Sequence, residues 1–119
     1  MKIVIAGSRK YNNYEEAKEF IESCIKDDSP HVIMSGGCRG ADKLGERYAE
    51  EKGYELRCFA AEWSRLGKAA GPLRNKIMAE EADVVVCFWD GQSSGTKSMI
   101  ELARALGKSV VIKRISIPQ

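Results

Sequence analysis

Five short apolar segments alternate with four amphipathic segments along the chain, and this alternation limits the fold more than any other feature. The apolar segments are mostly continuous, which is typical of strands that are buried on both faces of a parallel sheet. They cover residues 2–6, 31–35, 55–60, 83–89 and 109–115. Because right-handed strand–helix–strand units allow few topologies, we predict an α/β fold, a doubly wound parallel sheet of five strands in the order 3-2-1-4-5 with helices on both faces.

The amphipathic segments between these strands are predicted to be helices. They cover about 17–25, 41–49, 72–81 and 96–106. Asn13 and Glu16 resemble a capping box before the first helix. Pro72 suits the first turn of the third helix, and Gly107 is predicted to end the fourth.

Length and charge restrict the class of protein. The chain has 119 residues, so we predict one domain over residues 1–119. No segment approaches the roughly 20 apolar residues of a membrane span, and the residues after Met1 lack a signal-peptide cleavage site, so we expect a cytoplasmic protein. A net charge of +2 argues against a general nucleic-acid coat, because non-specific DNA binding neutralises many phosphates at once.

The cysteines and the single histidine do not form a metal-binding pattern. The four cysteines are far apart, and we expect Cys24, Cys58 and Cys87 to behave as small core residues, whereas Cys38 lies in a glycine-rich loop. His31 is predicted to be a surface residue, and composition nearly excludes a Ser-His-Asp relay. We therefore expect that no metal and no cofactor is required.

The segments that follow the predicted strands are rich in glycine, serine and basic residues, whereas those that precede the strands are short and plain. The segments that follow the strands cover residues 7–9, 35–42, 63–75 and 90–96. In a parallel sheet they meet at one edge, where doubly wound sheets bind their ligands. Glycine permits close backbone approach, and each segment leads to a helix amino terminus, which attracts anions. We predict a phosphate site at this edge, between the first and fourth strands.

Cations gather in the same segments although the whole chain is nearly neutral. The cations are Arg9, Arg39, Arg65, Lys68, Arg74 and Lys97, of which Lys97 directly follows the last segment. The acids in and beside the same segments are Asp42, Glu62 and Asp90. The local field is therefore predicted to be positive. The positive charge of Arg74 is unfavourable at a predicted helix start, where the helix dipole is also positive. A nearby anion would offset this repulsion. Neither the G-x-G-x-x-G fingerprint nor the P-loop pattern is present, which disfavours kinase-like or ATPase-like phosphoryl transfer.

The two tryptophans have different expected roles. Trp89 ends a strand and is predicted to pack in the core or at its rim. Trp63 lies among small and basic residues, where it could either stack on a base or pack within the loop.

Taken together, these segments resemble the YspA/YpsA-related branch of the SLOG superfamily over nearly the whole chain. The matching segments are Gly7-Ser8-Arg9, residues 35–42, Trp63 followed by residues 67–75, and Ser94-Gly95-Thr96. The resemblance implies a Rossmann-like fold and a nucleotide, ADP-ribose or NAD-derived ligand. Distant relatives in that superfamily are the lonely-guy phosphoribohydrolases and the DNA-processing protein DprA.

The resemblance to the phosphoribohydrolases is incomplete at the residues that act on the glycosidic bond. Arg74 and Met78 match their Arg-Lys-x-x-Met helix start, but Asn75 stands in the lysine place. Met99 stands where their Gly-Thr-x-x-Glu loop has glutamate, and Glu101 is about 200° further round a helix. An acid for catalysis would then be Asp42, Glu62 or Asp90, although Asp42 is equally explained as a first-turn helix acid.

These observations lead to one function hypothesis and two alternatives. We expect binding or sensing of a phosphorylated nucleotide-type ligand by a protein that crosses no membrane, with a homodimer left open. The alternatives are a nucleotide or ADP-ribose N-glycosidase, with Asp42 and Arg74 as catalytic candidates, and single-stranded nucleic-acid binding, which the near-neutral charge disfavours. The expected ligand-binding residues are Gly7, Ser8, Arg9, Gly36, Gly37, Arg39, Gly40, Asp42, Trp63, Lys68, Arg74, Asn75, Ser94, Gly95 and Thr96.

Overall fold

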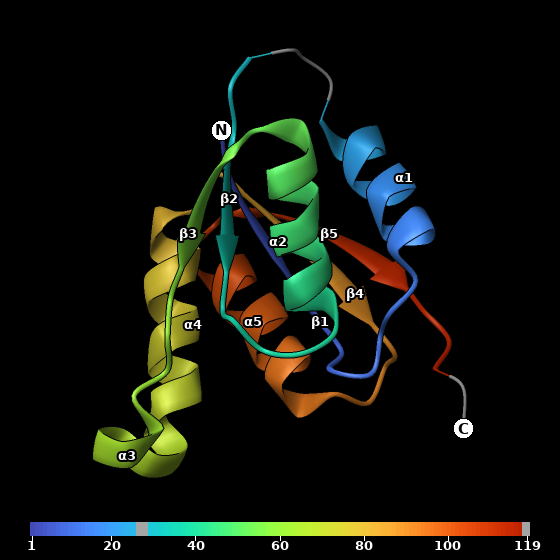
Figure 1. Cartoon of the computed structure of the whole chain (residues 1–119). Helices are drawn as coiled ribbons and strands as arrows, with labels where there is room; N and C mark the ends of the chain where they lie inside the picture. The colour runs from blue at the N-terminus through green and yellow to red at the C-terminus, as the bar shows by residue number, and fades with distance from the viewer. Residues whose placement is uncertain (26–28, 118–119) are drawn as a thin grey trace.

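Strands and helices alternate along the chain as the sequence predicts (Figure 1). The computed structural model describes residues 1–25 and 29–117. In chain order the elements are β1 (Lys2–Gly7), α1 (Tyr14–Cys24), β2 (Val32–Ser35), α2 (Ala41–Lys52), β3 (Glu55–Cys58), α3 (Trp63–Leu66), a 3₁₀ turn (Gly67–Ala69), α4 (Ala70–Glu81), β4 (Val84–Trp89), α5 (Ser94–Ala105) and β5 (Ser109–Arg114).

All five strands are parallel, in the order β3-β2-β1-β4-β5, which confirms the predicted α/β fold and topology. Ile3 of β1 lies opposite Ile33 of β2 on one side and Val84 of β4 on the other. The chain therefore winds outward from β1 in one direction and then returns to start again at β4. This reversal places the carboxyl ends of β1 and β4 next to each other.

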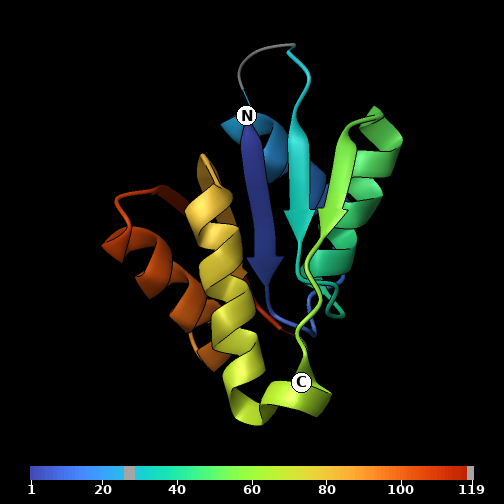
Figure 2. The same ribbon diagram turned by 90° about the vertical axis from the view of Figure 1, so that its left-hand side faces the viewer.

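Each face of the sheet contributes to its own apolar cluster. Side chains of Ile3, Ile5 and Phe88 pack with α1 and α2 on one face. Val4 and Val85 pack with α4 and α5 on the other face. Figure 2 shows α4 and α2 on opposite sides of the strands, α4 on the left and α2 on the right. Because neighbouring residues of a strand point to opposite faces, an unbroken apolar sequence supplies both clusters.

The expectation that all strands are buried on both faces is wrong at the two edge strands: no residue of β5 is buried, and the departure is largest at β3. All of its residues are exposed, including Leu56 at 39%. It pairs with β2 alone, and α4 packs mainly against α5 instead. Cys58 is consequently exposed and is not the small core residue that the sequence suggested, whereas Cys87 is buried as expected.

His31 is buried, which corrects its prediction as a surface residue. Only 1% of the residue is exposed. Its Nδ1 lies 3.2 Å from the amino nitrogen of Met1, and its ring meets the ring of Tyr54 edge-on at 5.3 Å. The residue packs between the start of β1 and the segment that leads into β3, a contact between positions distant in sequence.

Helix boundaries differ from the predictions mainly around the cavity described below. The segment between β3 and Pro72 was expected to be a loop but contains α3 and the 3₁₀ turn, and α4 begins two residues before Pro72. The predicted cap of α1 and the predicted stop of α5 are confirmed. Asn13 Oδ1 accepts a hydrogen bond from the Glu16 amide, and Gly107 follows α5 with a positive φ. Within residues 1–25 and 29–117, none of the helices has the length and apolar character to cross a membrane.

Close packing of α2 on β1 makes Gly45 a sensitive position. A Cβ at Gly45 would lie 2.6 Å from the Cβ of Ile5. We expect Gly45→Ala to lower the free energy of unfolding by about 1–3 kcal/mol, measured by urea denaturation, because the core must shift to admit the methyl group. Gly95→Ala is the matched control, since nothing lies within 4 Å of its added Cβ. Equal stabilities of the two variants would contradict the close α2–β1 packing.

Candidate functional site

A cavity of about 640 Å³ opens at the carboxyl ends of β1 and β4, beyond their last pair, Gly7 and Phe88. The strand arrows in Figure 2 point toward this end of the molecule. We call it the main cavity. Its apolar floor is formed by Ala6, Met78 and Met99. Its location agrees with the edge at which the sequence predicts a ligand site.

The structure brings most of the predicted site residues into the lining of the main cavity. These are Gly7, Ser8, Arg9, Asp42, Trp63, Arg74, Asn75, Ser94, Gly95 and Thr96. Gly36, Gly37, Arg39, Gly40 and Lys68 do not belong to that lining. Arg39 and Lys68 are exposed, so their charges point into solvent rather than into the cavity.

Several lining residues were not among the predicted site residues. They are Lys10, Cys38, Gly71, Pro72, Asp90, Gln92, Ser93 and Ser98, besides the floor residues. All of these except Lys10 and Ser98 lie within the segments 35–42, 63–75 and 90–96 that the sequence singles out, and Lys10 directly follows the segment 7–9. Met78 and Met99 carry no such signal, because a buried methionine is usually a core residue.

The turn after β1 is fixed by its own backbone. The Ser8 amide donates to the carbonyl of Phe88 at 3.0 Å, and the Ser8 carbonyl accepts from the amide of Ala41 at 3.1 Å. Gly40 adopts a φ of +77°, and a Cβ there would lie 2.2 Å from the Ser8 oxygen. Glycine at position 40 therefore allows the start of α2 to pack directly against the turn after β1. Gly40 has this packing role and does not line the cavity.

The start of α5 forms another wall of the main cavity. Ser93 caps the helix, and its hydroxyl lies 3.1 Å from that of Thr96. Asp90 accepts hydrogen bonds from the amides of Gln92 and Ser93, which hold the pKa of its carboxyl below the usual value. Ser94 and Gly95 line the cavity from the first turn, where backbone amides lack intrahelical acceptors. This wall is suited to an anion.

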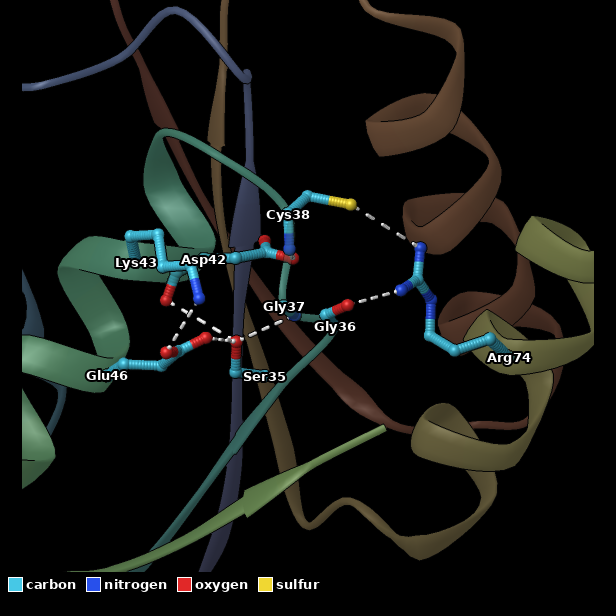
Figure 3. Close-up of polar contacts among 8 residues, drawn as sticks. All are labelled: Ser35, Gly36, Gly37, Cys38, Asp42, Lys43, Glu46 and Arg74. Atoms are coloured by element: carbon cyan, nitrogen blue, oxygen red, sulfur yellow. Dashed lines mark hydrogen bonds and ion pairs between the residues drawn. The ribbon is translucent and has the colours of Figure 1, made fainter. Parts of the chain in front are cut away.

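Arg74 links α4 to the loop after β2. Its Nη1 donates to the carbonyl of Gly36 at 2.6 Å, and its Nη2 lies 4.0 Å from the Cys38 sulfur (Figure 3). Its Nε donates to Asn75 Oδ1 at 3.0 Å. Because α4 begins at Ala70, Arg74 lies in the second turn rather than at the helix start. The predicted conflict with the helix dipole is therefore much reduced, and backbone carbonyls compensate the charge.

Asp42 lies beneath that loop and is 6% exposed. Its Oδ2 accepts a hydrogen bond from the Cys38 amide at 3.1 Å, and Figure 3 shows the carboxyl between Cys38 and the helix that bears Glu46. Burial raises its pKa to about 6, against the opposing effects of this hydrogen bond and of Arg74. A Cβ on Gly36 would lie 2.5 Å from Arg74 Nη1 and 2.9 Å from Asp42 Oδ2. Glycine at position 36 thus lets the guanidinium and the carboxyl approach the same backbone turn.

The two tryptophans differ in exposure. Trp63 is 51% exposed at the rim of the main cavity, and a Cβ on Gly71 would lie 3.1 Å from its ring. Trp89 is half-buried, and its indole N–H donates to the carbonyl of Ser93 at 3.1 Å. Trp89 therefore packs at the rim of the core, whereas one face of Trp63 is accessible.

The cationic excess in the main cavity is smaller than the loop sequences suggest. Arg9, Lys10 and Arg74 line it together with the acids Asp42 and Asp90. Of the other predicted cations, Arg65 donates to Glu62 at 3.1 Å, and Lys97 lies 3.9 Å from Glu101. Glu101 is exposed in that pair and does not line the cavity, whereas Met99 does, as the helical spacing predicts.

The comparisons with known proteins identify the family. The family described as YspA, cpYpsA-related SLOG matches residues 1–66. This chain belongs to that SLOG family. Among curated proteins, the SLOG chain is similar to the Gene 61 protein of Mycobacterium phage D29, with 31% identity over 121 residues, which cover 92% of this chain and 94% of that protein.

Among solved structures, the SLOG chain is similar to DNA processing protein A (DprA) from Streptococcus pneumoniae. The two superpose with a TM-score of 0.78 at 20% identity, over 98% of this chain and 51% of that one. The SLOG chain thus spans about half the length of DprA. At this identity the likeness shows the shared Rossmann-like fold.

The raised pKa of Asp42 predicts a measurable pH dependence of stability. The folded protein binds this proton more tightly than the unfolded chain, so the free energy of unfolding falls as pH rises from about 4 to about 6. Asp42→Asn is expected to be more stable than the wild type at pH 7.5, by about 2–4 kcal/mol, with the difference disappearing below pH 4. Urea denaturation across this pH range measures it.

Glu101→Gln is the control for Asp42→Asn, because it also removes one carboxylate but from the exposed side of α5. Its stability profile should follow that of the wild type. If Asp42→Asn is instead less stable than the wild type at pH 7.5, then hydrogen bonding and Arg74 outweigh the cost of burying the charge.

Proposed function

We propose that the chain binds a phosphorylated nucleotide-type ligand in the main cavity. The observation that carries this proposal is the meeting of the α5 amino terminus with Ser8, Arg9 and Lys10 around one open cavity. Backbone amides, hydroxyls and cations are the groups that bind phosphate in proteins, and they converge here from elements far apart in sequence. The resemblance of these segments to the SLOG superfamily supports the same class of ligand.

The phosphate groups and the base of such a ligand would each have a counterpart in the main cavity. Phosphate groups would lie against the first turn of α5, between Ser94–Thr96 and Arg9. The accessible face of Trp63 would stack on the base, because an aromatic ring can stack on any nucleobase. Arg74 would act mainly by holding Gly36 and the loop after β2 in place. The free thiols, among them the exposed Cys58, suit a reducing compartment such as the cytoplasm.

Arg9 provides the direct test. We expect a thermal-shift panel of ADP-ribose, NAD and the four nucleoside monophosphates to contain stabilising ligands, with affinities then measured by calorimetry. Arg9→Gln should weaken their binding about ten-fold or more, because a charge-assisted hydrogen bond to phosphate is lost. Lys76→Gln removes an exposed cation of α4 that does not line the main cavity, so its affinities should be unchanged. If no member of the panel binds, or if both variants behave alike, the proposal is wrong.

One observation favours an enzyme as the second candidate. Asp42 is buried, lines the main cavity and has a pKa of about 6, close to the working pH of a general base. In an N-glycosidase it would take a proton from water as the oxygen bonds to the anomeric carbon, while the base leaves with the electron pair of the broken bond. Chromatography of the incubated ligands distinguishes the candidates. Binding without release of base supports the sensor, and release that Asp42→Asn abolishes supports the enzyme.

The likeness to a DNA processing protein makes single-stranded nucleic acid the remaining candidate. The net charge of +2 and the mixed charges of the main cavity do not favour it. A strand binder should lose affinity for an oligonucleotide steeply as salt rises, because bound counterions are released. Tight oligonucleotide binding with such a salt dependence would overturn the small-ligand proposal.

A further inference from the structure

A second cavity, of about 270 Å³, lies beside the main one and is absent from the function proposed above. Its walls come from the loop between β1 and α1 and from the segment that follows β5. They include Lys10, Tyr11, Asn12, Glu16, Arg114 and Ser116. Lys10 also lines the main cavity, so the two cavities meet at this residue.

Cations gather where the cavities meet. Lys10 and Arg114 line the second cavity, and Arg9 lines the main cavity directly before Lys10. The Arg114 guanidinium packs closely on Gly91, where a Cβ would lie 2.2 Å from Nη2, and it lies 5.9 Å from the centre of the Trp89 ring. Gly91 and its neighbour Asp90 belong to the loop after β4, so Arg114 lies beside a wall of the main cavity.

The nearby acids already have partners. Glu16 accepts a hydrogen bond from the Tyr11 hydroxyl at 2.7 Å. Asp90 accepts from two backbone amides, of Gln92 and Ser93. Arg9, Lys10 and Arg114 outnumber the carboxylates of Glu16 and Asp90 by three to two, so the junction of the cavities keeps a net charge of +1. The lining of the second cavity also includes the neutral side chains of Asn12 and Ser116. Amide and hydroxyl groups of this kind bind sugar hydroxyls.

We infer that the ligand is a nucleoside diphosphate linked to a sugar, with its nucleoside in the main cavity, its diphosphate at the junction and its terminal sugar in the second cavity. The inference rests on the proposed function and narrows its ligand class. A mononucleotide would leave the second cavity and Arg114 without a part of the ligand to contact.

Matched pairs of ligands test this inference. ADP and ADP-ribose differ by one ribose, and UDP and UDP-glucose differ by one hexose. We expect calorimetry to show that the sugar-linked member of at least one pair binds about ten-fold more tightly, because a few additional hydrogen bonds form in the second cavity. Equal affinities within both pairs would overturn the inference while leaving the proposed function intact. Binding of no nucleotide at all would overturn the proposed function itself.

A variant that fills the second cavity gives an independent measurement. Ser116→Phe should bring the affinity for the sugar-linked ligand down to that for the diphosphate, and leave the affinity for the diphosphate unchanged. Ser109→Phe, at the exposed start of β5, is the matched control and should retain the preference. Thermal unfolding without ligand verifies that both variants fold. If Ser116→Phe keeps the full preference for the sugar-linked ligand, the second cavity does not bind the sugar.

Discussion

The turn that follows β1 is the constraint on which the site depends. There the backbone of Ser8 bonds both to Phe88 of β4 and to Ala41 at the start of α2. One residue thus joins two neighbouring parallel strands to a helix that packs on one face of the sheet. The helices that follow β1 and β4 lie on opposite faces, so the chain diverges beyond this turn. The divergence leaves the space that becomes the main cavity.

A second layer of interactions closes that space from the other face. Arg74 extends from α4 across Gly36 to the loop after β2, and Asp42 lies beneath the same turn. The arginine is held by carbonyl groups and the carboxyl by an amide, so each charge has a backbone partner. Both residues line the main cavity, yet their first role is to fix its wall. A ligand would therefore meet a preformed site rather than two mobile charged side chains.

Local sequence signals predicted the repeated structure well. Strand order, the Asn13 cap and the stop at Gly107 follow from rules that act within a few residues or within one strand–helix unit. The helix α3 was missed because its four residues lack a periodic apolar pattern. The exposure of β3 was missed because an apolar run does not reveal whether a strand lies at the edge of its sheet, or which helices cover it.

The sequence alone determined the class of fold, the edge at which the main cavity opens and most of the residues that line it, because all loops after parallel strands must lie at that edge. Only the tertiary structure decided what each of them does. It placed Arg39 and Lys68 in solvent, gave Arg74 backbone partners and buried Asp42. These outcomes depend on contacts such as that between Arg74 and Gly36, across 38 positions, for which no local pattern in the chain provides a signal.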